Sequence, residues 1–352
     1  MASAARNTRP VAAGRLIAAA VAVLALICAC TGQPPRPTAR AARRDAPARS
    51  PTPPSPSRIL AGAAVPGTFG RYQVGERQVT FVEPAHAGPG GQSLGPRWLE
   101  TEIRYPRPPR PAGAAPARGP FPLLLFAPGF MQCGGPYGRL LHAWVSAGYV
   151  VAVVNFPRTD CHTGTAAYEP DLVNQPGDMS YVLSRLLALS TKRRGLLSGL
   201  LNRREIAAAG QSDGGDTVAA LAANACCTDH RLAAAVVLSG AEWPPMPGRY
   251  FPHRPPPMLF VQGSADPVNP PWTSLQLYRA DMSGRRYYLD LLGADHMVPY
   301  VGSNPVEQLV ARVTLAFLDR YVLGQAQALG RMTREGNVRG AAALVSGRQL
   351  PP

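Results

Sequence analysis

The stretch that decides the fold is EIAAAGQSDGG, residues 205–215. It reads as a short apolar strand, a Gly-x-Ser-x-Gly turn, and a helix that follows over residues 215–224. A Cβ at either glycine of such a turn would collide with the crossing backbone, so the pattern depends on Gly210 and Gly214. The alternative interpretation of Ser212 is an ordinary turn serine, because the motif also arises by chance in a glycine-rich chain. The residues that accompany it decide between the two.

The alternation of short apolar runs with helical patterns extends over residues 67–323. Residues 78–82 and 100–105 are predicted to pair as antiparallel strands at one edge of a sheet. Short strands that alternate with helices predict one α/β domain, in which a mostly parallel sheet carries helices on both faces. The other strands are expected at 121–127, 148–155, near 206, 232–238, 258–262 and 287–291, and the helices at 137–146, 178–189, 215–224 and 305–323.

Two residues after late strands complete a candidate catalytic set. Asp266 follows the strand at 258–262, and His296 follows the strand at 287–291. A serine hydroxyl needs a base to become a nucleophile, and the base needs an acid to orient it. Taken alone, Asp266 before a proline could start a turn and His296 could be a loop histidine. The order serine, acid, histidine, with each residue after a strand, predicts a triad of Ser212, Asp266 and His296.

A triad of this kind also needs two N–H groups that stabilise the oxyanion of the intermediate. One is expected to be the backbone N–H of Asp213, the residue after the candidate nucleophile. The other is expected to be the N–H of Phe130, in the loop after the strand at 121–127, where Gly129 allows close approach. A plain turn at the end of the strand is the alternative for this loop.

Three apolar residues on predicted strand-end loops are candidates for an acyl pocket, although such residues often serve only in packing. They are Met131, Trp243 and Tyr300. The chain contains no long insertion that reads as a lid, so we expect a shallow, open site that favours short to medium acyl chains.

The N-terminal segment, residues 1–30, is typical of an export signal. Three arginines precede an uncharged apolar run at 16–27, which is shorter than the about 20 residues that span a bilayer. The run ends in Ile-Cys-Ala-Cys, which resembles a bacterial lipoprotein signal and predicts lipidation of Cys30. An ordinary cleaved signal is the alternative. Residues 31–66 are rich in proline, alanine and arginine and predict an extended tether whose arginines can contact anionic headgroups.

The charge of the chain is uneven. Of the net charge of +15, residues 1–58 contribute +8, from nine arginines and one aspartate. The sequence has no zinc-finger, RNA-binding or helix-turn-helix pattern, so nucleic-acid binding is not expected. The expected partners are instead a membrane, reached through the lipid anchor, and a small-molecule or lipid ester.

Four cysteines remain for the mature domain if Cys28 is removed with the signal and Cys30 is lipidated. An even number in an exported protein predicts disulfides. Pairing of Cys133 with Cys161 is favoured, because both are placed in loops at the same end of the sheet. The adjacent Cys226 and Cys227 could form a vicinal bridge or stay reduced. No Cys-x-x-Cys or histidine cluster indicates a metal site.

Taken together, residues 70–323 resemble the α/β-hydrolase superfamily. The branch resembled holds platelet-activating-factor acetylhydrolases, chlorophyllase-like enzymes, bacterial polyester hydrolases and dienelactone-hydrolase-like proteins. The resemblance implies a serine esterase without a metal or organic cofactor. Gln211 and Asp213 stand where polyester hydrolases carry an aromatic residue and a methionine, and Pro128 stands where many relatives carry histidine. The motifs that carry the resemblance are at 72–75, 102–106, 210–215, 263–267 and 295–296.

The sequence therefore predicts an exported, lipid-anchored, monomeric carboxylesterase, with residues 67–323 as its hydrolase domain and 324–352 as a peripheral tail. Two alternatives remain open. One is a phospholipase-type esterase or an acyltransferase that uses the same triad. The other is a surface lipoprotein in which the hydrolase fold only binds.

Overall fold

The computed structural model of the chain describes residues 70, 72–108 and 116–351. Contacts between Cα atoms divide the chain into the units Met1–Pro51 and Thr52–Pro352, and every described residue belongs to the second unit. The expected signal peptide at 1–30, its lipidation site Cys30 and the tether at 31–66 lie outside the described residues. Within the part that the structure describes, each helix is too short or too polar to span a bilayer.

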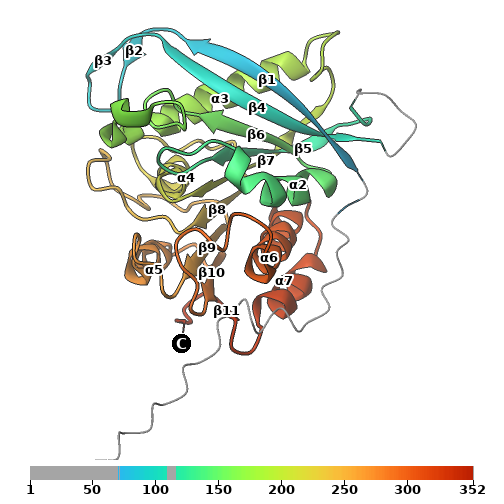
Figure 1. Cartoon of the computed structure of the whole chain (residues 1–352), viewed down its shortest axis with the longest axis vertical. Helices are drawn as coiled ribbons and strands as arrows, with labels where there is room; N and C mark the ends of the chain where they lie inside the picture. The colour runs from blue at the N-terminus through green and yellow to red at the C-terminus, as the bar shows by residue number, and fades with distance from the viewer. Residues whose placement is uncertain (1–69, 71, 109–115, 352) are drawn as a thin grey trace, which may run out of the picture. The chain divides into compact units, whose positions relative to one another are not determined.

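A nine-stranded sheet runs through the centre of the described region (Figure 1). Its strand order is β1-β4-β6-β5-β7-β8-β9-β10-β11, and the six strands from β6 to β10 in this order run parallel. The antiparallel pair β1 and β4 forms one edge, as the sequence predicts. The strands are β1 Gln73–Glu83, β4 Arg97–Arg107, β5 Phe121–Ala127, β6 Val150–Asn155, β7 Leu201–Gln211, β8 Ala234–Leu238, β9 Met258–Gly263, β10 Arg286–Leu291 and β11 Ala342–Ser346, and a separate small sheet pairs β2 His86–Ala87 with β3 Ser93–Leu94.

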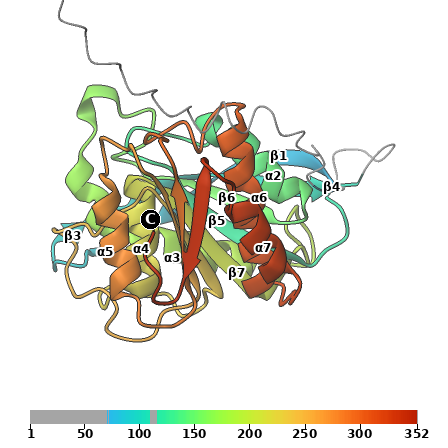
Figure 2. The ribbon, with the colours of Figure 1, turned by 90° about the horizontal axis from the view of Figure 1, so that it is seen from below.

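Helices cover both faces of the sheet (Figure 2). Alternate residues of β5 point to opposite faces, so Phe126 packs near Trp144 on one side, while Leu125 belongs to a second core. This arrangement confirms the predicted α/β class with a mostly parallel sheet. The first face carries α2 Gly138–Ser146, α6 Pro305–Tyr321 and α7 Ala328–Gly336, and the second carries α3 Gln175–Ser190, α4 Asp213–Ala223 and α5 Pro271–Ala280. Three short 3-10 helices, η1 Gly135–Tyr137, η2 Gly164–Ala166 and η3 Glu169–Asn174, lie in the connecting loops.

The C-terminal tail, residues 324–352, differs from the expectation of a peripheral segment. Its helix α7 packs against α6, with Ala328 and Met332 fully buried. Its strand β11 pairs antiparallel with β10, so the tail forms the far edge of the sheet. The sequence signal is weak because β11 is five residues long and only its first residue is buried. Helix α5 has no predicted counterpart for a similar reason, since only three of its ten residues are buried.

A buried ionic cluster connects the edge of the sheet to the second helical layer. The Nε atom of Arg97, the first residue of β4, donates to Asp178 of α3 over 2.6 Å. Its Nη2 atom donates to Asp171 of η3 over 2.7 Å. All three side chains are at least 94 % shielded from solvent, so each charge depends on the others for compensation.

We expect Arg97→Ala to lower the free energy of unfolding by about 3–5 kcal/mol, because it leaves two buried carboxylates without their cationic partner. Chemical denaturation followed by circular dichroism measures this change. Arg77→Ala is the control, because Arg77 is exposed on β1 and its removal is expected to cost less than about 0.5 kcal/mol. Equal effects of the two substitutions would contradict the assignment.

Candidate active site

Ser212 sits between β7 and α4, in a turn that only a few side chains tolerate. Its backbone has φ 56° and ψ −126°, a strained conformation outside the normal helical and strand regions. A Cβ on Gly210 would lie 2.0 Å from the carbonyl oxygen of Gly214, and a Cβ on Gly214 would lie 2.0 Å from that of Ala127 in β5. The two glycines therefore have the role that the sequence predicts, because the backbone crosses itself and its neighbour at these points.

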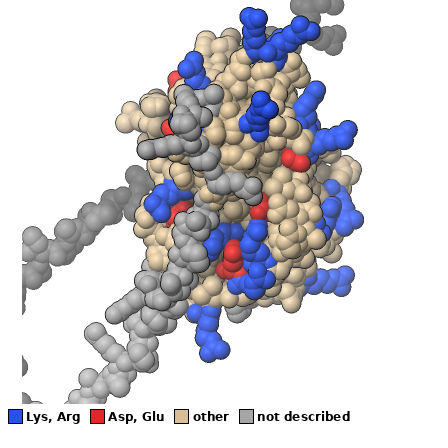
Figure 3. Space-filling model, turned by 90° about the vertical axis from the view of Figure 1, so that its right-hand side faces the viewer, with Lys and Arg blue, Asp and Glu red and all other residues tan. Residues whose placement is uncertain are grey.

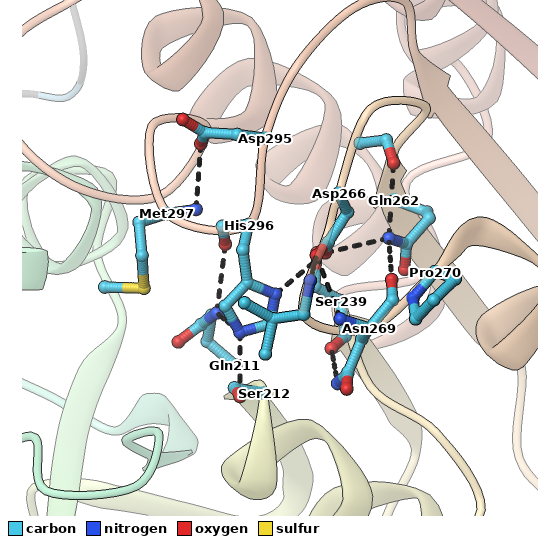
Figure 4. Close-up of polar contacts among 12 residues, drawn as sticks. Gln211, Ser212, Ser239, Gln262, Asp266, Asn269, Pro270, Asp295, His296 and Met297 are labelled. Atoms are coloured by element: carbon cyan, nitrogen blue, oxygen red, sulfur yellow. Dashed lines mark hydrogen bonds and ion pairs between the residues drawn. The ribbon is translucent and has the colours of Figure 1, made fainter. Parts of the chain in front are cut away.

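Hydrogen bonds join the three candidate catalytic side chains into one chain of contacts (Figure 4). Ser212 is 84 residues from His296 in the sequence, and Asp266 is 30 residues from it. The Nε2 atom of His296 lies 2.9 Å from the Ser212 Oγ. The Nδ1 atom of the same ring lies 2.8 Å from Oδ2 of Asp266. His296 and Asp266 are buried, whereas Ser212 is half-buried. The hydroxyl is thus the member of the set that a solute can reach most easily.

Three N–H donors hold the Asp266 carboxylate. Oδ1 of Asp266 accepts the backbone N–H groups of Val268 and Asn269, each over 2.9 Å, and Oδ2 accepts the Gln262 amide over 3.0 Å. A carboxylate that receives three such donors has only one role left toward the imidazole, which is to accept the Nδ1 proton. Nε2 of His296 is then free to accept a proton from the serine.

The loop after β5 lies against the nucleophile, where the second oxyanion donor is expected. A Cβ on Gly129 would lie 3.2 Å from the Ser212 Cβ, so the missing side chain permits this close approach. Within the described residues, the Phe130 N–H makes no hydrogen bond. The next residue, Met131, has φ 56° and donates its own N–H to the Thr159 carbonyl, which fixes the loop. The Phe130 N–H is therefore available to a ligand.

The side chain of the other predicted donor, Asp213, carries a perturbed carboxyl group. Burial, and next the charge of Glu169, raise the pKa of this carboxyl to about 7. Its Oδ2 atom is buried and has no hydrogen-bond partner among the described residues. Burial, and to a smaller extent the charge of Asp213, raise the pKa of the Tyr137 hydroxyl. Near neutral pH this carboxyl therefore becomes an anion, one residue along the chain from Ser212.

Gln211 and Tyr137 contact this machinery but were not among the predicted site residues. The Gln211 amide nitrogen donates to the His296 carbonyl over 3.2 Å and lies 3.3 Å from its Nε2 atom. A carbonyl can only accept, so this contact fixes the orientation of the amide. The Tyr137 hydroxyl donates to Gln211 Oε1 over 2.8 Å and accepts the Gly129 N–H over 3.2 Å. This relay joins His296 to the loop after β5, residues 128–134, which is named the oxyanion loop for the role expected of it. In the sequence, only the position of Gln211 beside the serine signals the relay.

The three predicted pocket residues have different environments. Met131 is 41 % exposed on the oxyanion loop and is open to a bound molecule. Trp243 is half-buried and packs beside Met246 and Leu172. Tyr300 is fully buried, and its hydroxyl contacts Ser239 and the Val261 carbonyl, so it supports the ends of β8 and β9 instead of lining an open pocket. The assignment of Tyr300 to the pocket was wrong, because an aromatic residue on a loop gives no sign of which way it points.

A disulfide joins Cys133 of the oxyanion loop to Cys161 of the loop after β6, with the Cα atoms 5.3 Å apart. This confirms the favoured pairing. The adjacent Cys226 and Cys227 are also joined in the structure. Cys133, Cys161 and His162 bring potential ligand atoms within 4.8 Å of one another, but both sulfurs are bonded to each other and offer no thiolate to a metal.

Neither a protein-family model nor a curated protein sequence matches this chain. A serine hydroxyl, an imidazole with a free lone pair, a carboxylate that orients it and an unpaired N–H beside the serine are the parts that acyl transfer requires.

We expect Gln211→Leu to slow the reaction of Ser212 with a fluorophosphonate probe by about tenfold, because the His296 ring and carbonyl lose the amide that positions them. Gln276→Leu is the matched control, since Gln276 is exposed and its amide donates to the Glu242 carboxylate. The measurement is the rate of covalent labelling, read by mass spectrometry. An unchanged rate in Gln211→Leu would show that the amide does not position the base.

Proposed function

We propose that this protein is a serine carboxylesterase with an α/β-hydrolase fold. The observation that carries the proposal is the continuous set of contacts from Asp266 through His296 to the Ser212 hydroxyl. The order of these residues along the chain, and their places at the carboxyl ends of β9, β10 and β7, are those of the superfamily that the sequence resembles.

The proposed reaction proceeds through an acyl-enzyme. Ser212 Oγ attacks the ester carbonyl while Nε2 of His296 takes its proton, and Asp266 supports the resulting positive charge. The N–H groups of Phe130 and Asp213 stabilise the tetrahedral oxyanion. The imidazolium returns its proton to the leaving alcohol, and water then repeats the sequence to release the acid.

Exposed apolar side chains close in sequence to the residues of the site support an ester with an apolar acyl group. Met131 lies on the oxyanion loop, Val268 and Trp272 follow Asp266, and Val298 follows His296. These residues leave the rim open, so short and medium acyl chains are the proposed substrates. The apolar run at 16–27, Cys30 and the tether support an exported protein that is anchored to a membrane by a lipid.

The purified protein is expected to hydrolyse p-nitrophenyl acetate and butyrate, and Ser212→Ala is expected to lose nearly all of this activity, by about 10⁴-fold or more. A phospholipid and an alcohol acceptor belong in the same assay, because the products separate an esterase from a phospholipase or an acyltransferase. Activity that survives in Ser212→Ala, or failure of Ser212 to react with a fluorophosphonate, would overturn the proposal.

The charge of Asp213 predicts the pH dependence on the alkaline side. Because the pKa of this carboxyl is raised to about 7, it is neutral below that pH and becomes an anion above it, on the residue whose N–H is a proposed oxyanion donor. We expect kcat/KM to fall as pH rises through 7 by about tenfold, and Asp213→Asn to abolish this fall while it matches the native protein at pH 6.

Glu169→Gln provides the matched test of this assignment. Removal of the neighbouring charge lowers the pKa of the Asp213 carboxyl, so the decline in kcat/KM should begin at a lower pH than in the native protein. Parallel pH profiles in the native protein and Asp213→Asn would contradict the role of this carboxyl.

A further inference from the structure

Six basic residues gather where two central strands begin. The loop before β5 approaches the loop before β7, since the Phe121 N–H donates to the Leu200 carbonyl over 2.7 Å and Phe121 pairs with Leu201 in the sheet. Figure 1 shows the loop after α3 beside the turn that leads into β5, and Figure 3, which views the molecule from that side, shows basic side chains in clear excess over acidic ones. The basic cluster consists of Arg118, Lys192, Arg193, Arg194, Arg203 and Arg204.

All six side chains of the basic cluster are exposed, and none is within 4.0 Å of a carboxylate in the described part of the chain. Glu205 is the acidic residue nearest to them in sequence, and it is half-buried. Like charges at this density repel one another, so the cluster stores an unfavourable electrostatic energy that an external anion relieves.

The scaffold beneath the cluster is well defined. Leu197, Leu200 and Leu201 are buried beneath it, and the Gly199 N–H donates to the Ser190 carbonyl over 2.9 Å. The Ser198 hydroxyl closes the loop by donating to the Lys192 carbonyl over 2.7 Å. The basic side chains therefore project from a fixed loop, and little backbone entropy is lost when a partner binds them.

The basic cluster and the triad lie at opposite ends of the parallel strands. Arg203 and Arg204 are near the start of β7, and Ser212 follows its end. At about 3.3 Å per residue, the strand separates Arg204 from Ser212 by roughly 25 Å. A partner bound to the basic cluster would therefore leave the triad uncovered.

We propose that the basic cluster docks the folded domain on a bilayer of anionic phospholipid, a function separate from the proposed esterase activity. Four to eight clustered basic residues suffice to recognise such a surface, and the guanidinium group pairs well with phosphate. No large apolar side chain is exposed in the described segments 116–120 or 190–205, so the cluster offers no aromatic platform for nucleobases. The basic cluster therefore recognises a partner by its negative charge. Docking through it holds Ser212 on the side of the domain that faces away from the lipid.

Hydrogen–deuterium exchange of the full chain reconstituted in lipid nanodiscs tests this proposal. We expect the peptide that covers residues 190–205 to exchange about tenfold more slowly on discs that contain phosphatidylglycerol than on discs of phosphatidylcholine alone, and high salt to remove the difference. The peptide that covers 339–348 serves as an internal reference, because it lies at the far edge of the sheet. The N-terminal anchor is the same on both discs, and the arginines of the tether, which can also respond to anionic lipid, are unchanged in the variants that follow.

Two charge-reversed variants separate the cluster from the general charge of the protein. Arg193, Arg194, Arg203 and Arg204 are changed to Glu in the first, and the exposed Arg249, Arg279, Arg285 and Arg334 in the second, so both have the same net charge. The first variant should lose the protection and the second should keep it, with unchanged circular dichroism in both. Equal loss in the two variants, equal protection on the two lipids, or protection by double-stranded DNA but not by lipid would overturn the proposal.

Discussion

The close crossing of three backbone segments around Gly210, Gly214 and Ala127 is the constraint on which the site depends. It forces Ser212 into a conformation with positive φ, which residues adopt only when their surroundings impose it. The N–H of Ser212 is held by the Leu238 carbonyl of the neighbouring strand, so the sheet itself supports the strain. The hydroxyl then stands above the strand ends, where loops after β5, β9 and β10 can reach it.

Much of this arrangement can be derived from the sequence, because the central strands are continuous apolar runs and their order fixes where the loops emerge. Ser212, Asp266 and His296 each follow a strand, and parallel strands bring such residues to one edge. The direction in which a side chain points cannot be derived from the sequence in the same way. The burial of Tyr300 and the contacts of Gln211 arise from packing between segments more than 60 residues apart, which no local pattern records.

The two edges of the sheet also differ in how well the sequence predicts them. Strand β4 is eleven residues long and mostly buried, and it pairs with β1 along its whole length, whereas β11 has one buried residue and depends on its partner strand for its structure. Buried charge is a further feature without a sequence signal. The network of Arg97, Asp171 and Asp178 joins residues that look like ordinary surface charges until the fold brings them together.

The antiparallel strand β11 has a consequence for the behaviour of shortened forms of the chain. It covers the backbone N–H and C=O groups of β10 along residues 287–291. A chain that stops before residue 342 would present that row of groups to solvent next to an apolar core, and another molecule could add a strand there. Strand β11 therefore protects the domain from self-association, a role separate from the proposed chemistry of the triad.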